Sequence, residues 1–137
     1  MKYLLDTNII SELGKPEPQK SVIDFLALTP VAWISTITLH ELEFGIALIP
    51  EGRKKWAIDK AISELVSYYG DYIIPVGKQE ASEAAAMLAF QEDEGRTLHL
   101  ADSLIAGTAK VRNLALVTRN VKDFDGLDIE LINPFEH

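Results

Sequence analysis

The stretch Tyr3-Leu4-Leu5-Asp6-Thr7-Asn8 at the start of the chain predicts the class of the fold. A short apolar run ends in an acid, and a helix is expected to begin directly after that acid. Short continuous apolar runs of this kind are typical of the buried strands of a parallel sheet. The same strand-to-helix switch, repeated along a chain, is typical of an α/β fold.

The rest of the chain repeats this alternation. Short apolar runs recur at residues 32–34, 72–74, 114–117 and 129–132. Between them lie longer segments with helical periodicity at 21–28, 38–49, 57–69 and 81–90, and a last helix from Leu100 that is expected to stop at Asn113. Strands that alternate with helices predict βαβ units. We therefore expect an α/β three-layer sandwich, in which a short, mostly parallel sheet is flanked by helices.

Length and composition limit the classes of function. The 137 residues predict a single domain over residues 1–137, and the absence of cysteine excludes disulfides and thiol catalysis. Lys and Arg number 13 against 21 Asp and Glu, a net charge of −8, which argues against a protein that coats a nucleic-acid duplex. An enzyme that uses a metal ion on phosphates remains open, because a cation reverses the local sign. No apolar run approaches the roughly 20 residues that span a bilayer, so a soluble, cytoplasmic protein without a membrane partner is expected.

Three acids occupy the places where an α/β sheet builds its sites, which lie at the carboxyl ends of strands. Asp6 follows the first apolar run, Glu41 lies one turn into the helix after the second, and Asp102 is surrounded by apolar or small residues. Converging carboxylates repel one another, and a hard cation such as Mg²⁺ or Mn²⁺ removes that repulsion. A cation held this way can activate water and neutralise the charge of a phosphate.

Each acid also has a structural interpretation. Asp6 could cap the helix that follows it. Glu41 lies three residues after Thr38, the spacing of a capping box. Asp102 could pair with His99. These alternatives stay open for each acid alone, but the joint pattern favours a metal site.

Four stretches of the chain carry a joint pattern: Leu4-Leu5-Asp6-Thr7-Asn8, Ile34-Ser35-Thr36-Ile37-Thr38-Leu39-His40-Glu41-Leu42, Leu100-Ala101-Asp102-Ser103-Leu104-Ile105-Ala106, and Leu116-Val117-Thr118-Arg119-Asn120 with Asp123-Phe124. Together, and in this order, they resemble the PIN-domain family, specifically the VapC-type toxins of bacterial toxin–antitoxin pairs. The resemblance covers essentially the whole chain. It implies an endoribonuclease that depends on Mg²⁺ or Mn²⁺, usually forms a homodimer, and is held inactive by a small antitoxin.

Carried over residue by residue, the resemblance places the catalytic and metal-binding acids at Asp6, Glu41 and Asp102. Asp6 and Asp102 are expected to bind the metal directly. Glu41 is expected to complete the pocket by contacting either the metal or a water bound to it. The residues expected to orient these ligands by hydrogen bonds are Thr7, Asn8 and Thr118. The reaction implied is attack of activated water on a phosphodiester of single-stranded or loop RNA, with tRNA among the candidates. His40 and His99 receive no catalytic role.

The fourth acid of the family is the one departure. Many family members have Asp where this sequence has Asn120. Asn offers a neutral carbonyl oxygen and no charge, which weakens a second metal site most. Asp123, three residues further on, is the candidate for compensation, and an ordinary polar loop is its alternative.

Two surfaces are candidates for substrate and partner. The cations expected to contact RNA are Arg96, Arg119 and Lys122, for which solvated loop positions are the alternative. Phe44 and Leu48 share a helix face, and with the Trp56 helix they are expected to form a groove for an antitoxin helix. A fully buried helix is the alternative there.

Two alternative functions stay open, and two other classes of protein do not fit the sequence. A PIN-fold module that binds RNA or protein, with catalysis weakened or lost through Asn120, remains open, as does a housekeeping RNA-processing PIN nuclease. A haloacid-dehalogenase phosphatase needs a second carboxylate at residue 8, which is Asn8. A receiver domain needs an acid after the third strand, where Pro75 stands instead.

Overall fold

The computed structural model describes residues 2–29 and 31–136. Its strands are β1 (Tyr3–Leu5), β2 (Ala32–Ser35), β3 (Ile73–Ile74), β4 (Ala115–Val117) and β5 (Leu131–Ile132). Its helices are α1 (Thr7–Leu13), α2 (Lys20–Ala27), α3 (Thr36–Ala47), α4 (Arg53–Tyr69), α5 (Lys78–Asp93) and α6 (Leu100–Arg112). Two 3₁₀ turns, η1 (Gly70–Tyr72) and η2 (Val121–Phe124), complete the described elements.

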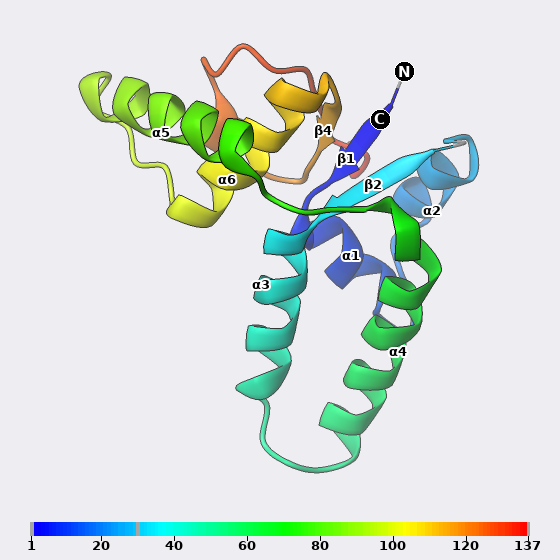
Figure 1. The fold of residues 1–137 in the computed structure, drawn as a ribbon. Helices are drawn as coiled ribbons and strands as arrows, with labels where there is room; N and C mark the ends of the chain where they lie inside the picture. Colours follow the sequence, from blue (N-terminus) through cyan, green and yellow to red (C-terminus); the bar gives the residue numbers. More distant parts are fainter. Residues whose placement is uncertain (1, 30, 137) are drawn as a thin grey trace.

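The strands form one sheet in the order β3-β2-β1-β4-β5, and every described pairing is parallel. The first strand of the sequence is therefore the central strand of the sheet (Figure 1). Leu5 of β1 is in register with Val117 of β4, so the residues that follow these two strands emerge side by side. The expected α/β sheet is confirmed.

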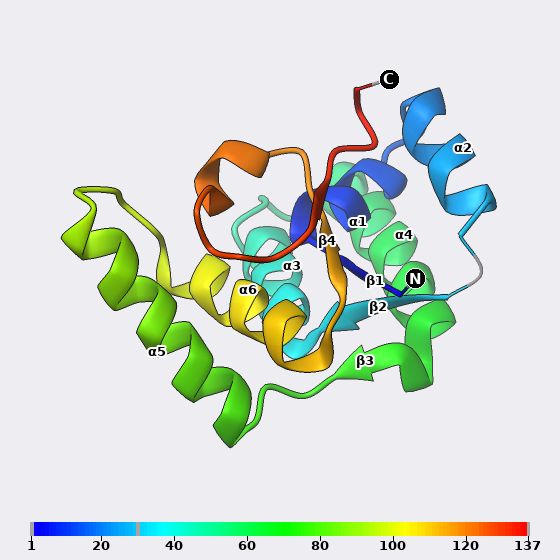
Figure 2. The same cartoon turned by 90° about the horizontal axis from the view of Figure 1, so that it is seen from above.

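Helices cover both faces of the sheet (Figure 2). Leu4 and Leu5 are both fully buried, and they point to opposite faces because side chains alternate along a strand. Leu4 packs in a cluster with Ile105 of α6 and Met87 of α5. Leu5 packs in a second cluster beneath α1 to α4. The sheet thus separates two apolar cores, and the three-layer architecture follows.

Most expected elements are confirmed within two or three residues. Tyr72 lies in η1, not in β3, and the last apolar run forms a strand only at Leu131–Ile132. Asn113 does end α6, in the left-handed conformation (φ 56°) that Asn adopts more readily than most residues.

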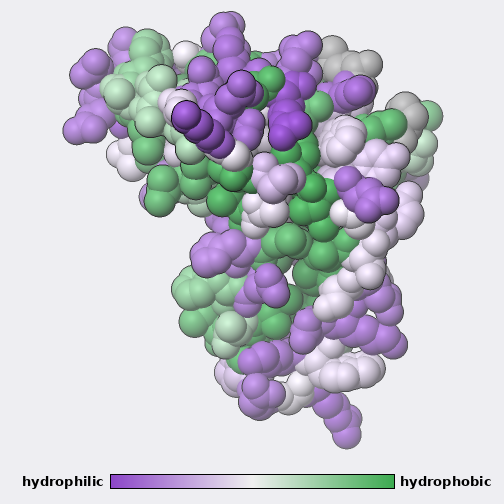
Figure 3. All heavy atoms as spheres, in the orientation of Figure 1, coloured by the Kyte–Doolittle hydropathy of each residue, from purple (hydrophilic) through white to green (hydrophobic). Residues whose placement is uncertain are grey.

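The α3–α4 hairpin projects away from the rest of the molecule (Figure 1). Hydrophobic residues gather on the surface over α3 (Figure 3), where Phe44 and Leu48 are exposed. Among the described residues, no helix combines the length and the apolar character that a membrane crossing requires.

Candidate functional site

Asp6 lies at the carboxyl end of the central strand. It caps α1, its Oδ1 accepting from the backbone N–H of Thr7 at 2.8 Å. Its Oδ2 accepts from the hydroxyl of Thr118 at 2.8 Å and from Nδ2 of Asn8 at 3.3 Å. Burial raises the pKa of Asp6, and the hydrogen bonds from Thr118 and Thr7 limit that rise. The capping interpretation is therefore confirmed, and it does not exclude a chemical role.

Glu41 projects from α3 toward the same place. The Thr7 hydroxyl donates to Oε1 of Glu41 at 2.6 Å and lies 3.2 Å from the hydroxyl of Thr38. The alternative of a capping box is wrong, because α3 begins earlier and is capped by Ser35, whose Oγ accepts from the N–H of Ile37 at 3.0 Å. The Glu41 carboxylate is thus held by α1 and not by its own helix.

Asp102 lies in the first turn of α6 and is half-buried. Burial, and next the negative charges of Asp6 and Glu41, raise the pKa of Asp102 to about 6. His99 acts on Asp102 only as a nearby charge, and the two side chains form no hydrogen bond within residues 2–29 and 31–136. The structural His99–Asp102 contact is therefore not found.

These acids share one cavity of about 330 Å³, here called the acid cavity. Its lining is Asp6, Thr7, Asn8, Ser11, Glu12, Lys15, Glu41, Asp102, Arg119, Asn120, Asp123 and Phe124. The structure brings together the three expected acids, two of the three expected orienting residues, and both candidates for the fourth position. The third orienting residue, Thr118, is fully buried behind Asp6.

The acid cavity suits a hard divalent cation by its chemistry. Three carboxylates from three separate elements supply oxygen donors, and burial together with the charges of Asp6 and Glu41 raises the pKa of Asp102. Each carboxylate oxygen can accept more than one bond, so the hydrogen bonds to Asp6 and Glu41 leave room for a metal. In the described part of the chain, no group of three or more Asp, Glu or His side chains is arranged so that it could already hold a metal ion. The residues fit Mg²⁺ or Mn²⁺ in kind, and waters would complete the coordination shell.

The segment after β4 supplies the two candidates for the fourth acid position, Asn120 and Asp123. The backbone N–H of Asn120 donates to the Thr118 hydroxyl at 3.1 Å, and the N–H of Asp123 donates to the carbonyl of Asn120 at 3.0 Å. Both side chains are exposed at the cavity lining. Asp123 adds to the negative charge around Asp102, which Asn120 does not.

Of the three cations expected to contact substrate, only Arg119 lines the acid cavity. Arg96 instead donates from Nη1 to the carbonyl of Asp125 at 2.9 Å, and Lys122 is exposed on η2 outside the lining. Sequence reasoning missed Glu12 and Lys15, which lie beside the acids. The signal was present as polar residues three and four apart from α1 into the turn after it, on the side away from the buried isoleucines of α1.

The expected antitoxin surface stays a prediction, and the structure adds a second candidate. Phe44, Leu48 and Trp56 are exposed by 59%, 68% and 67%, so the alternative of a fully buried helix is wrong for them. None of them lines the apolar groove of about 280 Å³ that the structure forms between α1, α3 and α4. Its aliphatic and small lining residues around these two helices are Leu42, Gly45 and Ile46 of α3, Ile49 of the turn that follows α3, and Ile58 and Ile62 of α4.

Helix geometry explains the difference. Phe44 and Leu48 each lie two positions from Ile46, about 200° around the helix, and Trp56 lies two positions from Ile58. The groove adjoins the acid cavity, because Thr7, Lys15 and Glu41 line both.

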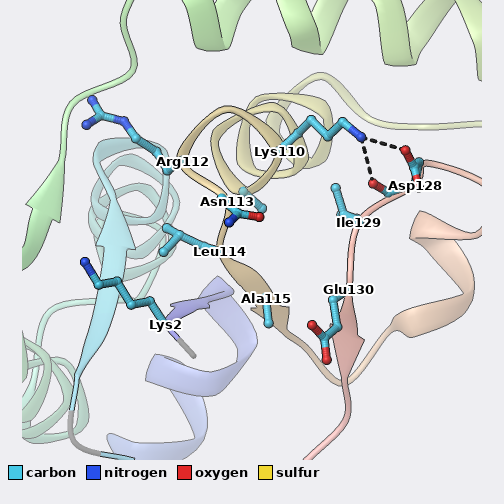
Figure 4. A pocket seen from close by; sticks show the side chains of 10 residues that line it. Lys2, Lys110, Arg112, Asn113, Leu114, Ala115, Asp128, Ile129 and Glu130 are labelled. Carbon is cyan, nitrogen blue, oxygen red and sulfur yellow. Dashed lines mark hydrogen bonds and ion pairs between the residues drawn. The ribbon is translucent and has the colours of Figure 1, made fainter.

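A larger cavity of about 970 Å³ lies at the opposite, amino end of the strands (Figure 4). Lys110 is paired there with Asp128 at 2.7 Å. Lys2, Arg112 and Glu130 add charges of mixed sign. None of the expected site residues lies there.

Comparison with known proteins agrees with the fold. The PIN domain family matches the chain over residues 3–129. Toxin FitB of Neisseria gonorrhoeae is 33% identical over 136 residues, which are 96% of this chain and 97% of the relative. The crystal structure of FitAcB from the same organism gives a TM-score of 0.88 at 30% identity, covering 98% of this chain and 99% of that one.

Two further relatives carry names that bear on function. The tRNA(fMet)-specific endonuclease VapC of Salmonella typhimurium is 31% identical over 135 residues, 95% of this chain and 97% of the relative. A toxin–antitoxin complex from Klebsiella pneumoniae gives a TM-score of 0.74 at 29% identity, covering 98% of this chain and 99% of that one.

Proposed function

The chain belongs to the PIN domain family, and we propose that it is the toxin of a VapC-type toxin–antitoxin pair, an endoribonuclease that works with a divalent cation. The observation that carries this proposal is the meeting of Asp6, Glu41 and Asp102, from three separate elements, in one cavity. The similarity to a toxin and to a tRNA endonuclease, each over nearly the whole chain, supports the same activity.

The residues around the acids would prepare the cavity for its metal. Asp6 and Asp102 would hold Mg²⁺ or Mn²⁺, which when bound supplies an activated water and neutralises the charge of the phosphate. Thr118 and Asn8 fix the orientation of the Asp6 carboxylate, and Thr7 fixes that of Glu41. Such outer hydrogen bonds set the direction and basicity of metal ligands.

Asn120 bears on how many cations are held. With Asn at the fourth position, the charged ligand set comprises Asp6, Glu41 and Asp102, with Asp123 exposed at the edge. This set favours one tightly held cation, because a neutral amide oxygen attracts a second ion far less than a carboxylate.

The antitoxin would occupy the groove between α1, α3 and α4. Its lining is mainly aliphatic, which suits the apolar face of a helix. Since Thr7, Lys15 and Glu41 line both the groove and the acid cavity, a segment seated in the groove would also restrict access to the acids.

The test is cleavage of a mixed RNA and tRNA pool by purified protein freed of any partner. Cleavage is expected with Mn²⁺ or Mg²⁺, and is expected to be absent in EDTA and in Asp6→Asn. Asp71→Asn is the matched control, because Asp71 is exposed on η1 and does not line the acid cavity.

The second candidate is a binding module, and the neutral side chain of Asn120 is the observation that favours it. A folded protein that binds Mn²⁺ and RNA but leaves every species of the pool intact would support that candidate and contradict the nuclease.

A further inference from the structure

Two cations face the acids of the cavity. In a chain of net charge −8, Lys15 and Arg119 are the only cationic side chains among the described residues that line the acid cavity. Lys15 follows the end of α1, and Arg119 follows β4. They come from segments more than 100 positions apart in the sequence, and the structure holds each of them in place.

Lys15 is held by a buried carboxylate. Its Nζ donates to Oε1 of Glu12 at 2.9 Å, while Oε2 of Glu12 accepts from the backbone N–H of Gln19 at 2.8 Å. The Glu12 side chain is 6% exposed, but the Lys15 side chain is 56% exposed. Hydrogen bonds from Lys15 and Gln19 lower the pKa of Glu12, and the charge of Arg119 lowers it further. Glu12 is therefore an ionised anchor, and Lys15 keeps donors free at the rim.

Arg119 is held by the face of its guanidinium and by its backbone. The ring of Phe135 lies 3.9 Å from the guanidinium carbon. The Arg119 N–H donates to Oδ1 of Asn8 at 3.2 Å, and its carbonyl accepts from Nδ2 of Asn133 at 3.2 Å. The side chain forms no hydrogen bond or ion pair with any residue of 2–29 or 31–136. Its planar fork of N–H donors is thus oriented and unused, as bidentate binding of a phosphate requires.

The segment 133–136 contains the two residues, Asn133 and Phe135, that contact Arg119. The N–H of Phe135 donates to Oδ1 of Asn133 at 2.9 Å, and the Phe135 carbonyl accepts from Nε2 of Gln19 at 3.2 Å. Gln19 is also the residue whose backbone N–H binds Glu12. The segment lies beside the start of α2 (Figure 2), so one set of contacts links the supports of both cations.

We propose that Lys15 and Arg119 form a phosphate clamp that holds the RNA backbone next to the scissile bond, with Glu12 and Phe135 as positioning residues. The proposal rests on the proposed ribonuclease function. The acids repel every phosphate that is not compensated by a cation, and these two side chains offer positive charge at the cavity lining. The clamp reads the backbone and not the bases, so it should act on single strands of any sequence.

The test separates RNA binding from cleavage. Binding of a 5′-fluorescein-labelled, mixed-sequence 12-nucleotide RNA is followed by anisotropy in EDTA over a range of NaCl concentrations. Arg119→Gln should weaken binding roughly tenfold for every sequence and reduce the slope of log K against log salt by about 0.7, the value of one single-strand phosphate contact. Phe135→Leu should weaken binding in the same direction, and Phe135→Tyr should restore it, because the ring is kept.

Lys54→Gln is the matched control, since Lys54 is exposed on α4 and lines neither the acid cavity nor the adjoining groove. With Mn²⁺ present, Arg119→Gln and Phe135→Leu should raise KM for RNA and leave kcat and the Mn²⁺ dissociation constant unchanged. A purely structural role of Phe135 would instead lower the melting temperature without a separate effect on KM.

The clamp is refuted if Arg119→Gln binds RNA with the affinity and salt slope of Lys54→Gln, even when the wild type cleaves RNA. It is also refuted if these variants lose affinity for a protein partner and not for RNA. Wild-type protein that binds RNA through Arg119 but never cleaves it would retain the clamp and overturn the proposed function.

Discussion

Replacing Asp102 by Asn should make the metal-free protein more stable at pH 8 and remove its affinity for divalent cations. Asn has nearly the shape of Asp but carries no charge. The Asp102 carboxylate accepts no hydrogen bond from any other described residue, so the substitution breaks no hydrogen bond within residues 2–29 and 31–136. What it removes is a charge that is half-buried near Asp6 and Glu41.

The magnitude follows from the pKa. The folded protein raises the pKa of Asp102 from 3.8 to about 6, so between these values the folded state binds the proton more tightly than the unfolded chain. Stability therefore falls as pH rises through this window, and the loss is complete above the folded pKa. Roughly two pH units correspond to at most about 3 kcal/mol, which partial exposure of Asp102 reduces to about 1–2 kcal/mol. The expected gain in melting temperature for Asp102→Asn is about 3–6 °C at pH 8.

Thermal unfolding followed by circular dichroism in EDTA measures this gain. At pH 5 the advantage of Asp102→Asn should fall to about half, because Asp102 is then largely protonated in the folded wild type. Adding Mn²⁺ should reverse the order, since only the wild type gains stability from bound metal, about 2.7 kcal/mol at 100 times its Kd. A metal-free variant less stable than wild type at pH 8, or equally favoured at both pH values, would refute the argument.

Three further substitutions address other parts of the account. Thr118→Val removes the 2.8 Å donor to Asp6 and should weaken Mn²⁺ binding, measured by calorimetry, roughly tenfold or more with the fold retained; unchanged affinity would show that the hydroxyl does not orient the ligand. Asn120→Asp should tighten Mn²⁺ binding and raise the rate of RNA cleavage, because it adds a carboxylate to the cavity lining; a slower enzyme would contradict this. Gly107→Ala places a Cβ 2.7 Å from the carbonyl oxygen of Glu80, so α5 and α6 must separate. The free energy of unfolding, measured in urea, should fall by about 1–3 kcal/mol. An unchanged free energy of unfolding would mean that the helices shift without cost.

The acids were predictable because their signal is local. Asp6 directly follows an apolar run, and Asp102 stands in apolar surroundings that a solvated acid does not need. The parallel sheet then brings these acids together, because the carboxyl ends of its strands lie at the same edge and the residues that follow them become neighbours. Glu41 was also singled out by its place after the second apolar run, and the resemblance supported its role where the capping-box spacing left a structural alternative open.

The residues that position Lys15 and Arg119 were not predictable in the same way. Phe135 contacts Arg119, and its carbonyl accepts from Gln19, 116 positions earlier in the chain. No periodicity links such positions, because the contact depends on where the segment after β5 crosses the molecule. Glu12 reads as an ordinary helix acid until its burial is known.

The groove between α1, α3 and α4 was not predictable for a related reason. The surplus of apolar residues on α3 was read correctly, but two faces of the helix are apolar. Only the packing of α3 on α4 shows that Ile46 faces the groove while Phe44 faces solvent. The homodimer, the cytoplasmic location and the single-domain boundary stay predictions.

The decisive experiment measures RNA cleavage as a function of Mn²⁺ concentration beside the Mn²⁺ binding isotherm of the same partner-free protein. If the reaction takes place at Asp6, Glu41 and Asp102, cleavage rises with occupancy of the metal site. Asp6→Asn then loses binding and cleavage together, and Asp71→Asn retains both. Cleavage that persists in Asp6→Asn or in EDTA would show that the chemistry does not take place at these acids.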